Sequence, residues 1–130
     1  GPQVDIHPRA PWRNGLVYDE TRDERGWLYP KLRGTAIERE HVHMVEDKDV
    51  LFKFNDEGDG WNEMKIVCDG TRLKSIVNGT VICDQDFAGI LDSDAHKKYN
   101  VGTRGEIALQ IHAKAQVNMR FKDIYIKELN

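Results

Sequence analysis

Residues 61–84, WNEMKIVCDGTRLKSIVNGTVICD, decide the fold class of this chain. They read as three antiparallel strands joined by turns at Asp69-Gly70 and Asn78-Gly79. Asp-Gly and Asn-Gly between β-rich runs predict tight hairpin turns, because these residues readily adopt positive φ. One face of the three strands is expected to be the core face, and it carries Met64, Ile66, Cys68, Leu73 and Val77.

The same hairpin reading predicts the state of the two cysteines. It pairs Val67 with Arg72 and Lys74 with Cys83, which puts Cys68 and Cys83 on opposite faces. The two cysteines also lie on strands separated by a third, so they are expected about 10 Å apart. That separation is too large for a disulfide, and both thiols are predicted to be free. Cysteine usage therefore does not decide the compartment.

Composition sets broad limits on the kind of protein. A chain of 130 residues forms at most one domain, and 39% hydrophobic residues suffice for one core. A net charge of -3 gives no basic footprint for nucleic acid. No apolar run approaches the roughly 18 residues that a membrane span needs.

Further strands are predicted on both sides of the hairpins. They cover residues 3–7, 16–21, 27–29, 50–54, 106–112 and 117–129. Residues 3–7, QVDIH, alternate, with Val4 and Ile6 on one face and polar side chains on the other. In residues 106–112 the alternation points Ile107, Leu109 and Ile111 toward the core, and a change of parity predicts a bulge near Lys122-Asp123.

The remaining segments carry little helix pattern. Residues 36–41 could make one helical turn, and residues 87–101 are expected to form a polar connection that rims a binding site. Many short strands with regular turn signals predict an antiparallel all-β sandwich.

Metal-binding signals are weak in this sequence. His41 and His43 alternate as ligands on one strand could, but no third ligand stands at a telling spacing. The acidic loop 55–60, NDEGDG, lacks the EF-hand pattern. Surface histidines and a solvated turn are the favoured interpretations.

Several motifs together resemble the 3-keto-disaccharide hydrolase domain family. They are Trp61-Asn62 with the hairpins of 64–84, GEIALQIH at 105–112, and VNMRFKDIYIKEL at 117–129. Upstream, GPQVDI and LVYDETR look like central strands of that family, whereas Ser75 stands where relatives often carry a larger residue. The resemblance implies a concanavalin A-like jelly roll, with residues 1–130 forming one β-sandwich domain that lacks the family's N-terminal strands.

The resemblance also implies partners and a compartment. The ligand would be a carbohydrate, an oxidised glucoside. A second chain or an oligomer that completes the sandwich is expected, because the missing strands would leave sheet edges open. The implied compartment is the bacterial periplasm or the extracellular space.

The implied reaction is cleavage of glycosides that carry a ketone at C3. The ketone acidifies the C2 proton, a base removes it, the group at C1 is expelled, and water adds back. Such an enzyme needs a base, a group that stabilises the enolate, and an acid for the leaving oxygen. A lectin-like, non-catalytic carbohydrate-binding module on the same sandwich is the alternative.

Candidate site residues come from the polar faces of the strands that match the family. The catalytic candidates are Asp5, Glu20 and His112. The candidates for substrate binding are His7, Tyr18, Trp61, Asn62, Gln110 and Arg120.

A cofactor is kept only as a hypothesis. A divalent cation held by Asp5, Glu20 or His7 would stabilise an enediolate. The sequence shows no compelling ligand set for it.

Overall fold

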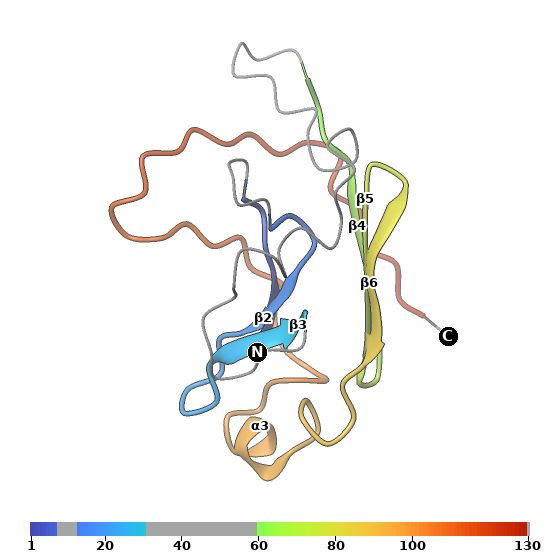
Figure 1. The fold of residues 1–130 in the computed structure, drawn as a ribbon, viewed down its shortest axis with the longest axis vertical. Coiled ribbons are helices and arrows are strands. Elements are labelled where there is room, and N and C mark those ends of the chain that lie inside the picture. The colour runs from blue at the N-terminus through green and yellow to red at the C-terminus, as the bar shows by residue number, and fades with distance from the viewer. Residues whose placement is uncertain (8–12, 31–59, 130) are drawn as a thin grey trace.

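The computed structural model describes residues 1–7, 13–30 and 60–129 (Figure 1). Its first antiparallel sheet has the order β1-β2-β3, formed by β1 (Pro2–Val4), β2 (Val17–Asp19) and β3 (Gly26–Tyr29). Its second has the order β4-β5-β6, formed by β4 (Met64–Asp69), β5 (Arg72–Val77) and β6 (Thr80–Asp86). The described residues are thus nearly all β, as predicted, and form a partial β-sandwich.

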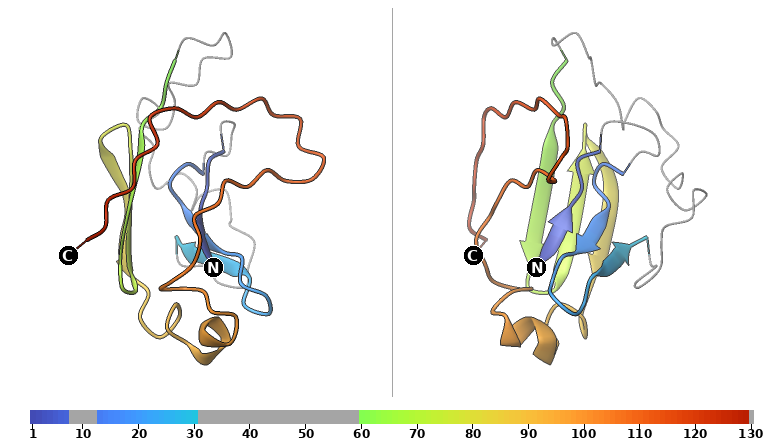
Figure 2. Two further views of the ribbon diagram at one scale, coloured as in Figure 1. Left: turned by 180° about the vertical axis from the view of Figure 1, so that it is seen from behind. Right: turned by 90° about the vertical axis from the view of Figure 1, so that its left-hand side faces the viewer.

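The two sheets face each other, and the short helix α3 (Asp94–Lys98) lies at one end of the pair (Figures 1 and 2). The buried cluster between them consists of Val17, Leu28, Leu73, Cys83, Phe87 and Leu91. A buried hydrogen bond of 2.6 Å from Ser75 Oγ to the carbonyl oxygen of Gly15 also joins the two layers. Ser75 therefore has a specific task in the core, which its small size permits.

The turn at Asn78-Gly79 forms as predicted, with φ of 48° and 83°. The first turn differs by one residue from the prediction. Asp69 pairs with Arg72, so the loop is Gly70-Thr71 and Val67 pairs with Lys74. Gly70 has a φ of 57°, and glycine at the first loop position is typical of a type II′ turn. The predicted pairing of Val67 with Arg72 is therefore wrong.

A bulge changes the second predicted register. Between β5 and β6 the pairing shifts between Ser75 and Ile76, so that Cys83 pairs with Ser75 and Lys74 pairs with Asp84. The predicted pairing of Lys74 with Cys83 is wrong, because hairpin counting cannot see the extra residue, Ile82.

The bulge also moves Cys83 to the inner face of the sheet. Cys83 pairs with Ser75, and Ser75 pairs with Ile66 on the other neighbouring strand. Ile66 and Cys68 lie on the same face of β4. The two cysteines therefore do not point to opposite faces. Both are nevertheless free, as predicted. Burial raises the pKa of the Cys83 thiol to about 12, which keeps it protonated and unreactive.

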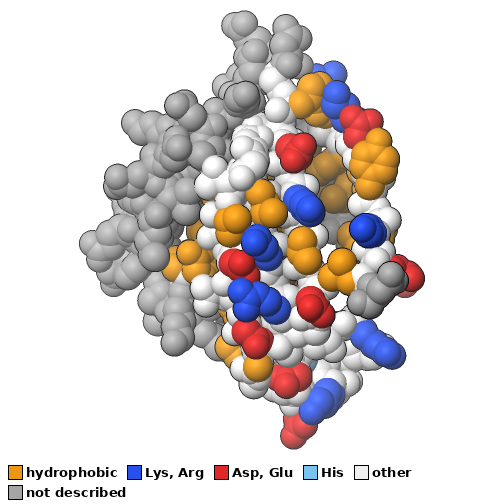
Figure 3. All heavy atoms as spheres, turned by 90° about the vertical axis from the view of Figure 1, so that its right-hand side faces the viewer, with side chains coloured by type: hydrophobic (Ala, Val, Ile, Leu, Met, Phe, Trp, Pro, Cys, Tyr) orange, Lys and Arg blue, Asp and Glu red, His pale blue; other side chains and the backbone are white. Residues whose placement is uncertain are grey.

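The outer face of β4-β5-β6 carries basic and acidic side chains with hydrophobic ones between them (Figure 3). Asp84 lies between two cations on this face, 2.7 Å from Arg72 Nη2 and 3.2 Å from Lys74 Nζ. Hydrogen bonds from Lys74 and Arg72 lower the pKa of Asp84. The carboxylate thus stays ionised beside its two partners.

The first two strands of the first sheet are shorter than predicted, whereas β3 begins one residue earlier than predicted. The strand expected over residues 3–7 ends at Val4, although Asp5 still donates to the carbonyl oxygen of Leu16 at 2.9 Å. The helical turn at 36–41, His41 and His43, the strand at 50–54 and most of the loop at 55–60 lie outside the described residues.

The connection 87–101 contains the helix α3, which the sequence analysis missed. Ser93 caps it by accepting from the backbone N–H of His96. Phe87, Leu91 and His96 are buried, so this connection packs against the core as well as presenting polar residues. No helix among the described residues is long and apolar enough to cross a membrane.

The predicted strands at 106–112 and 117–129 are wrong for this structure. Neither segment pairs with the two sheets that the described residues form, and Ile107, Leu109 and Ile111 are 79%, 60% and 60% exposed. Asp123 has a φ of 52° at the place of the predicted bulge. Alternation makes a segment able to form a strand, but the strand also requires a sheet edge that pairs with it.

We expect Leu73→Ala to lower the free energy of unfolding by about 2–5 kcal/mol, because it opens a cavity between the sheets. Val81→Ala on the same sheet is the control, because Val81 is exposed. It should cost less than about 1 kcal/mol. Urea unfolding of both variants measures the difference, and equal losses would contradict the packing described above.

Candidate active site

A row of paired residues crosses the face of β1-β2-β3 that points away from the second sheet. Gln3 pairs with Tyr18, and Tyr18 pairs with Trp27. Residues directly opposite each other in a sheet share a face. The rings of Tyr18 and Trp27 meet edge to face, with centroids 5.0 Å apart. This face therefore carries two aromatic rings and an amide beside the end of β1, with Trp27 buried and Gln3 and Tyr18 half-buried.

Asp5 follows β1 at the edge of this surface, and its backbone is held on both sides. Its N–H donates to Leu16 and its carbonyl oxygen accepts from Gly15, each at 2.9 Å. Its carboxylate accepts a hydrogen bond of 2.6 Å from Gln3 Nε2 and lies 3.8 Å from Arg13 Nε. The position of the carboxylate is therefore well defined.

The environment of Asp5 changes its acidity. Its side chain is only 12% exposed, and desolvation by burial raises the pKa of the carboxyl. The hydrogen bond from Gln3 and the charges of Arg13, His7 and His112 act in the opposite direction. Because burial dominates, Asp5 is a stronger base than a solvated carboxylate and remains partly accessible.

The structure brings two predicted histidines toward Asp5. His7 and His112 both lie within electrostatic range of its carboxylate. The backbone N–H of His7 donates to Asn14 Oδ1 at 2.6 Å, which fixes the chain just beyond Asp5. His112 reaches the same place from the C-terminal segment and is exposed. The charges of both histidines lower the pKa of Asp5, and the catalytic pairing of Asp5 with His112 stays a prediction.

The third catalytic candidate, Glu20, lies two residues beyond Tyr18. Its carboxylate forms an ion pair of 3.3 Å with Arg25, and its N–H donates to Gly1 at 3.0 Å. Glu20 is therefore directed to Arg25 at the end of β2.

Other predicted residues gather around Trp61 at the entry to β4. The ring of Trp61 is 43% exposed and lies 5.5 Å from Arg120 and 4.3 Å from Lys122. Asn62 accepts a hydrogen bond of 3.1 Å from Asn78. Arg120, a predicted substrate-binding residue, thus lies beside the Trp61 ring. Gln110 is exposed.

Arg13 was missed by the sequence analysis. Its guanidinium lies 5.5 Å from the Trp27 ring centroid and beside Asp5. Among the described residues, its buried Nε finds no hydrogen-bond partner. A single arginine in a loop gives no sequence signal, because its proximity to Asp5 depends on how the loop folds back.

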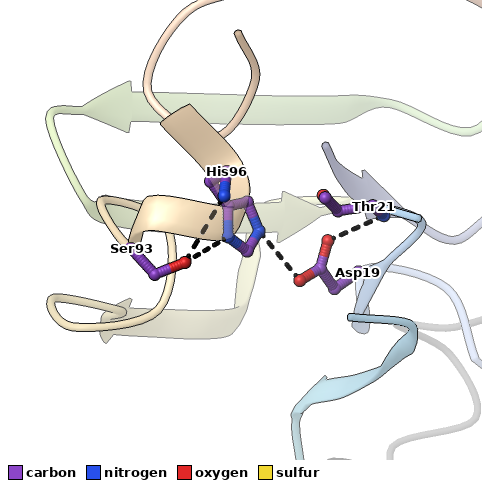
Figure 4. Close-up of polar contacts among 4 residues, drawn as sticks. All are labelled: Asp19, Thr21, Ser93 and His96. Carbon is purple, nitrogen blue, oxygen red and sulfur yellow. Dashed lines mark hydrogen bonds and ion pairs between the residues drawn. The ribbon is translucent and has the colours of Figure 1, made fainter. Parts of the chain in front are cut away.

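A second missed feature is a buried network on the opposite face of β2 (Figure 4). Asp19 Oδ2 lies 2.9 Å from His96 Nε2, and His96 Nδ1 lies 2.8 Å from Ser93 Oγ. Asp19 Oδ1 accepts from the N–H of Thr21 at 3.0 Å. Asp19 and His96 are both fully buried. The only sequence signal is the helix-capping position of Ser93, which does not indicate burial.

The described residues do not assemble a metal site. Within residues 1–7, 13–30 and 60–129, no group of three or more His, Cys, Asp or Glu side chains could hold a metal ion. The divalent cation stays a hypothesis, and no chemical step below is assigned to it.

Two facing antiparallel sheets, with a buried carboxylate near histidines on an outer face, define a β-sandwich with a candidate acid–base site. The chain belongs to the 3-keto-alpha-glucoside-1,2-lyase-like domain family, whose model matches residues 1–127. This membership confirms the resemblance and relates the chain to glycoside chemistry. No curated protein and no solved structure matches the chain.

Asp5→Asn should change stability in a pH-dependent way. Because the pKa of Asp5 is raised in the folded state, its favourable contribution is present below the unfolded pKa. The contribution is lost as pH rises through the folded pKa. Asn keeps the shape without the buried charge, so the melting temperature of Asp5→Asn relative to wild type should rise between pH 3 and pH 7, by a few degrees.

Asp84→Asn provides a control of opposite sign. The pKa of Asp84 is lowered, so its contribution is present above the unfolded pKa and lost as pH falls. Its variant should be less stable than wild type at pH 7 and equal to it near pH 2. Thermal melts across this range compare the two, and a shared sign would contradict the assignment for Asp5.

Proposed function

We propose that this protein cleaves 3-keto-glycosides and that Asp5 is the general base. The observation that carries the proposal is the Asp5 carboxylate, which is mostly buried, has a raised pKa and lies near His112. Family membership supports the substrate class. A partly accessible carboxyl with a raised pKa favours an acid–base role over a non-catalytic carbohydrate-binding module.

The reaction begins with transfer of the C2 proton to the Asp5 carboxylate. The electron pair of the C2–H bond moves toward the C3 ketone and gives an enediolate. The electron pair of the enediolate then forms the C1–C2 double bond, while the bond from C1 to the leaving oxygen breaks. The leaving oxygen takes a proton from an acid, and addition of water across the double bond completes net hydrolysis.

His112 and Arg13 supply the other roles near Asp5. His112 is the acid that protonates the leaving oxygen, since it extends from a separate segment toward the same carboxylate. Arg13 stabilises the enolate oxygen, because its guanidinium lies next to Asp5 and carries the positive charge that an enolate needs. Tyr18 orients the sugar from the neighbouring strand.

Trp61 and the residues beside it support the alternative function, a carbohydrate-binding module. Exposed tryptophans offer an apolar face on which sugars stack. The ring of Trp61, however, already has Arg120 and Lys122 beside it. Under the proposed function Trp61 contributes to binding, whereas Asp5 carries the chemistry.

The substrate test compares an oxidised glucoside with its unoxidised parent. The protein should release the aglycone from a 3-keto-glucoside and leave the parent glucoside intact, because only the ketone acidifies the C2 proton. Chromatography of the released aglycone measures both rates. Equal rates on the two substrates would contradict elimination through C2. Binding of both without cleavage would indicate the carbohydrate-binding module.

Substitutions at the candidate residues test the site. Asp5→Asn and His112→Ala should each lower kcat by about 100-fold or more, since each removes a proton-transfer group. Glu20→Gln should also lose turnover if Glu20 is catalytic. Asp84→Asn, on the outer face of the other sheet, is the matched control and should retain activity. If the three site variants remain fully active, the catalytic group lies elsewhere.

A further inference from the structure

We propose that Asp19 and His96 form a positioning pair for the candidate site. They hold strand β2 and the start of the C-terminal segment in the arrangement that places Tyr18 beside Gln3 and His112 near Asp5. This inference rests on the proposed function, because it concerns the same site.

The pair is built for a defined geometry. Both side chains are 0% exposed, and every polar atom of their functional groups has a partner (Figure 4). One Asp19 oxygen faces His96 Nε2 at 2.9 Å and the other accepts from Thr21 at 3.0 Å. His96 Nδ1 faces Ser93 Oγ at 2.8 Å. Because a buried carboxylate without partners is costly, these elements cannot shift without breaking the network.

On one side, the pair fixes strand β2. Asp19 is the last residue of β2 and pairs with Pro2 and Gly26 on the flanking strands. Successive side chains of a strand point to opposite faces. Anchoring Asp19 to α3 on the inner side therefore presents Tyr18 on the outer face, next to Gln3.

On the other side, the backbone of His96 holds the start of the C-terminal segment. The carbonyl oxygen of His96 accepts from Val101 at 3.0 Å. Gly102 has a φ of 96°, and a side chain there would collide with the carbonyl oxygen of Leu91. A Cβ on Gly1 would lie 3.7 Å from Val101, so this departure point is adjacent to the start of β1. The segment that carries His112 thus begins from a place defined by His96.

Stability alone does not explain a buried carboxylate–imidazole pair. Replacing such a pair with apolar residues of similar volume is often neutral or stabilising, because desolvation offsets the attraction. Apolar side chains, however, lack the directional bond that fixes the distance between β2 and α3. The two roles are therefore separable by experiment.

The experiment uses the full chain and three variants. Asp19→Val combined with His96→Phe replaces the pair with apolar volume. Asp19→Asn is the conservative variant, which retains the contacts to Thr21 and His96. Tyr99→Phe is the matched control, because it removes the 2.8 Å hydrogen bond from Tyr99 to Asp23, which also connects the end of α3 to the turn after β2.

Two readouts are measured on each folded variant: kcat and KM on a 3-keto-glucoside, and the backbone amide shifts of Asp5, Tyr18 and His112. The apolar pair should lower kcat about 100-fold with KM within about twofold, as expected for a site displaced by about 1 Å. It should also move all three amide shifts. Asp19→Asn should restore most of kcat, and Tyr99→Phe should match wild type in both readouts.

If the double variant with apolar residues has the same kcat and the same amide shifts as the wild type, the inference is overturned. The network then has a structural role alone. If the wild type does not cleave the 3-keto-glucoside, the proposed function fails, and the amide shifts alone decide whether the pair positions these residues. If the apolar pair does not fold, His96→Gln takes its place under the same criteria.

Discussion

The hydrogen bond from Ser75 to Gly15 is the contact on which the rest of the structure depends. It is buried, 2.6 Å long, and joins the central strand of one sheet to the chain that leads into the other. The N–H of Gly15 donates to Asp5, and the next residue, Leu16, accepts from Asp5. A side chain on Gly15 would lie 2.9 Å from Ile82, so glycine is needed there. The contact that spaces the sheets therefore also holds the backbone of the candidate base.

Two aspartates on opposite faces of the first sheet differ in their roles because their environments differ. Asp19 has no exposed surface, and both of its oxygens have partners. Asp5 keeps a small exposed fraction and carries a pKa raised by burial. A carboxylate that is fully paired holds elements together, whereas one that is desolvated yet accessible can exchange a proton with a bound molecule.

Local signals explain which parts of the fold and the site could be predicted. The Asn78-Gly79 turn and the family motifs are linear features, so the hairpins and the family were identified correctly. The alternation around Asp5 also indicated its polar face. The registers failed at Gly70 and Ile82 because turn type and bulges depend on the partner strands. Arg13 and His96 gave no signal, since their importance arises only when distant segments meet.

From the bulge at Ile82 onward, the side chains of β6 exchange the faces of the sheet that regular alternation would give them. Before it, Val81 faces outward, and after it Asp84 does so, with Ile82 and Cys83 both buried between them. Without that extra residue, the same sequence would turn Asp84 toward the core and Cys83 toward Arg72 and Lys74. Deleting one residue here would thus invert the downstream half of the strand, whereas substituting one would change a single side chain. At this point of β6, the number of residues therefore matters more for the structure than which residues they are.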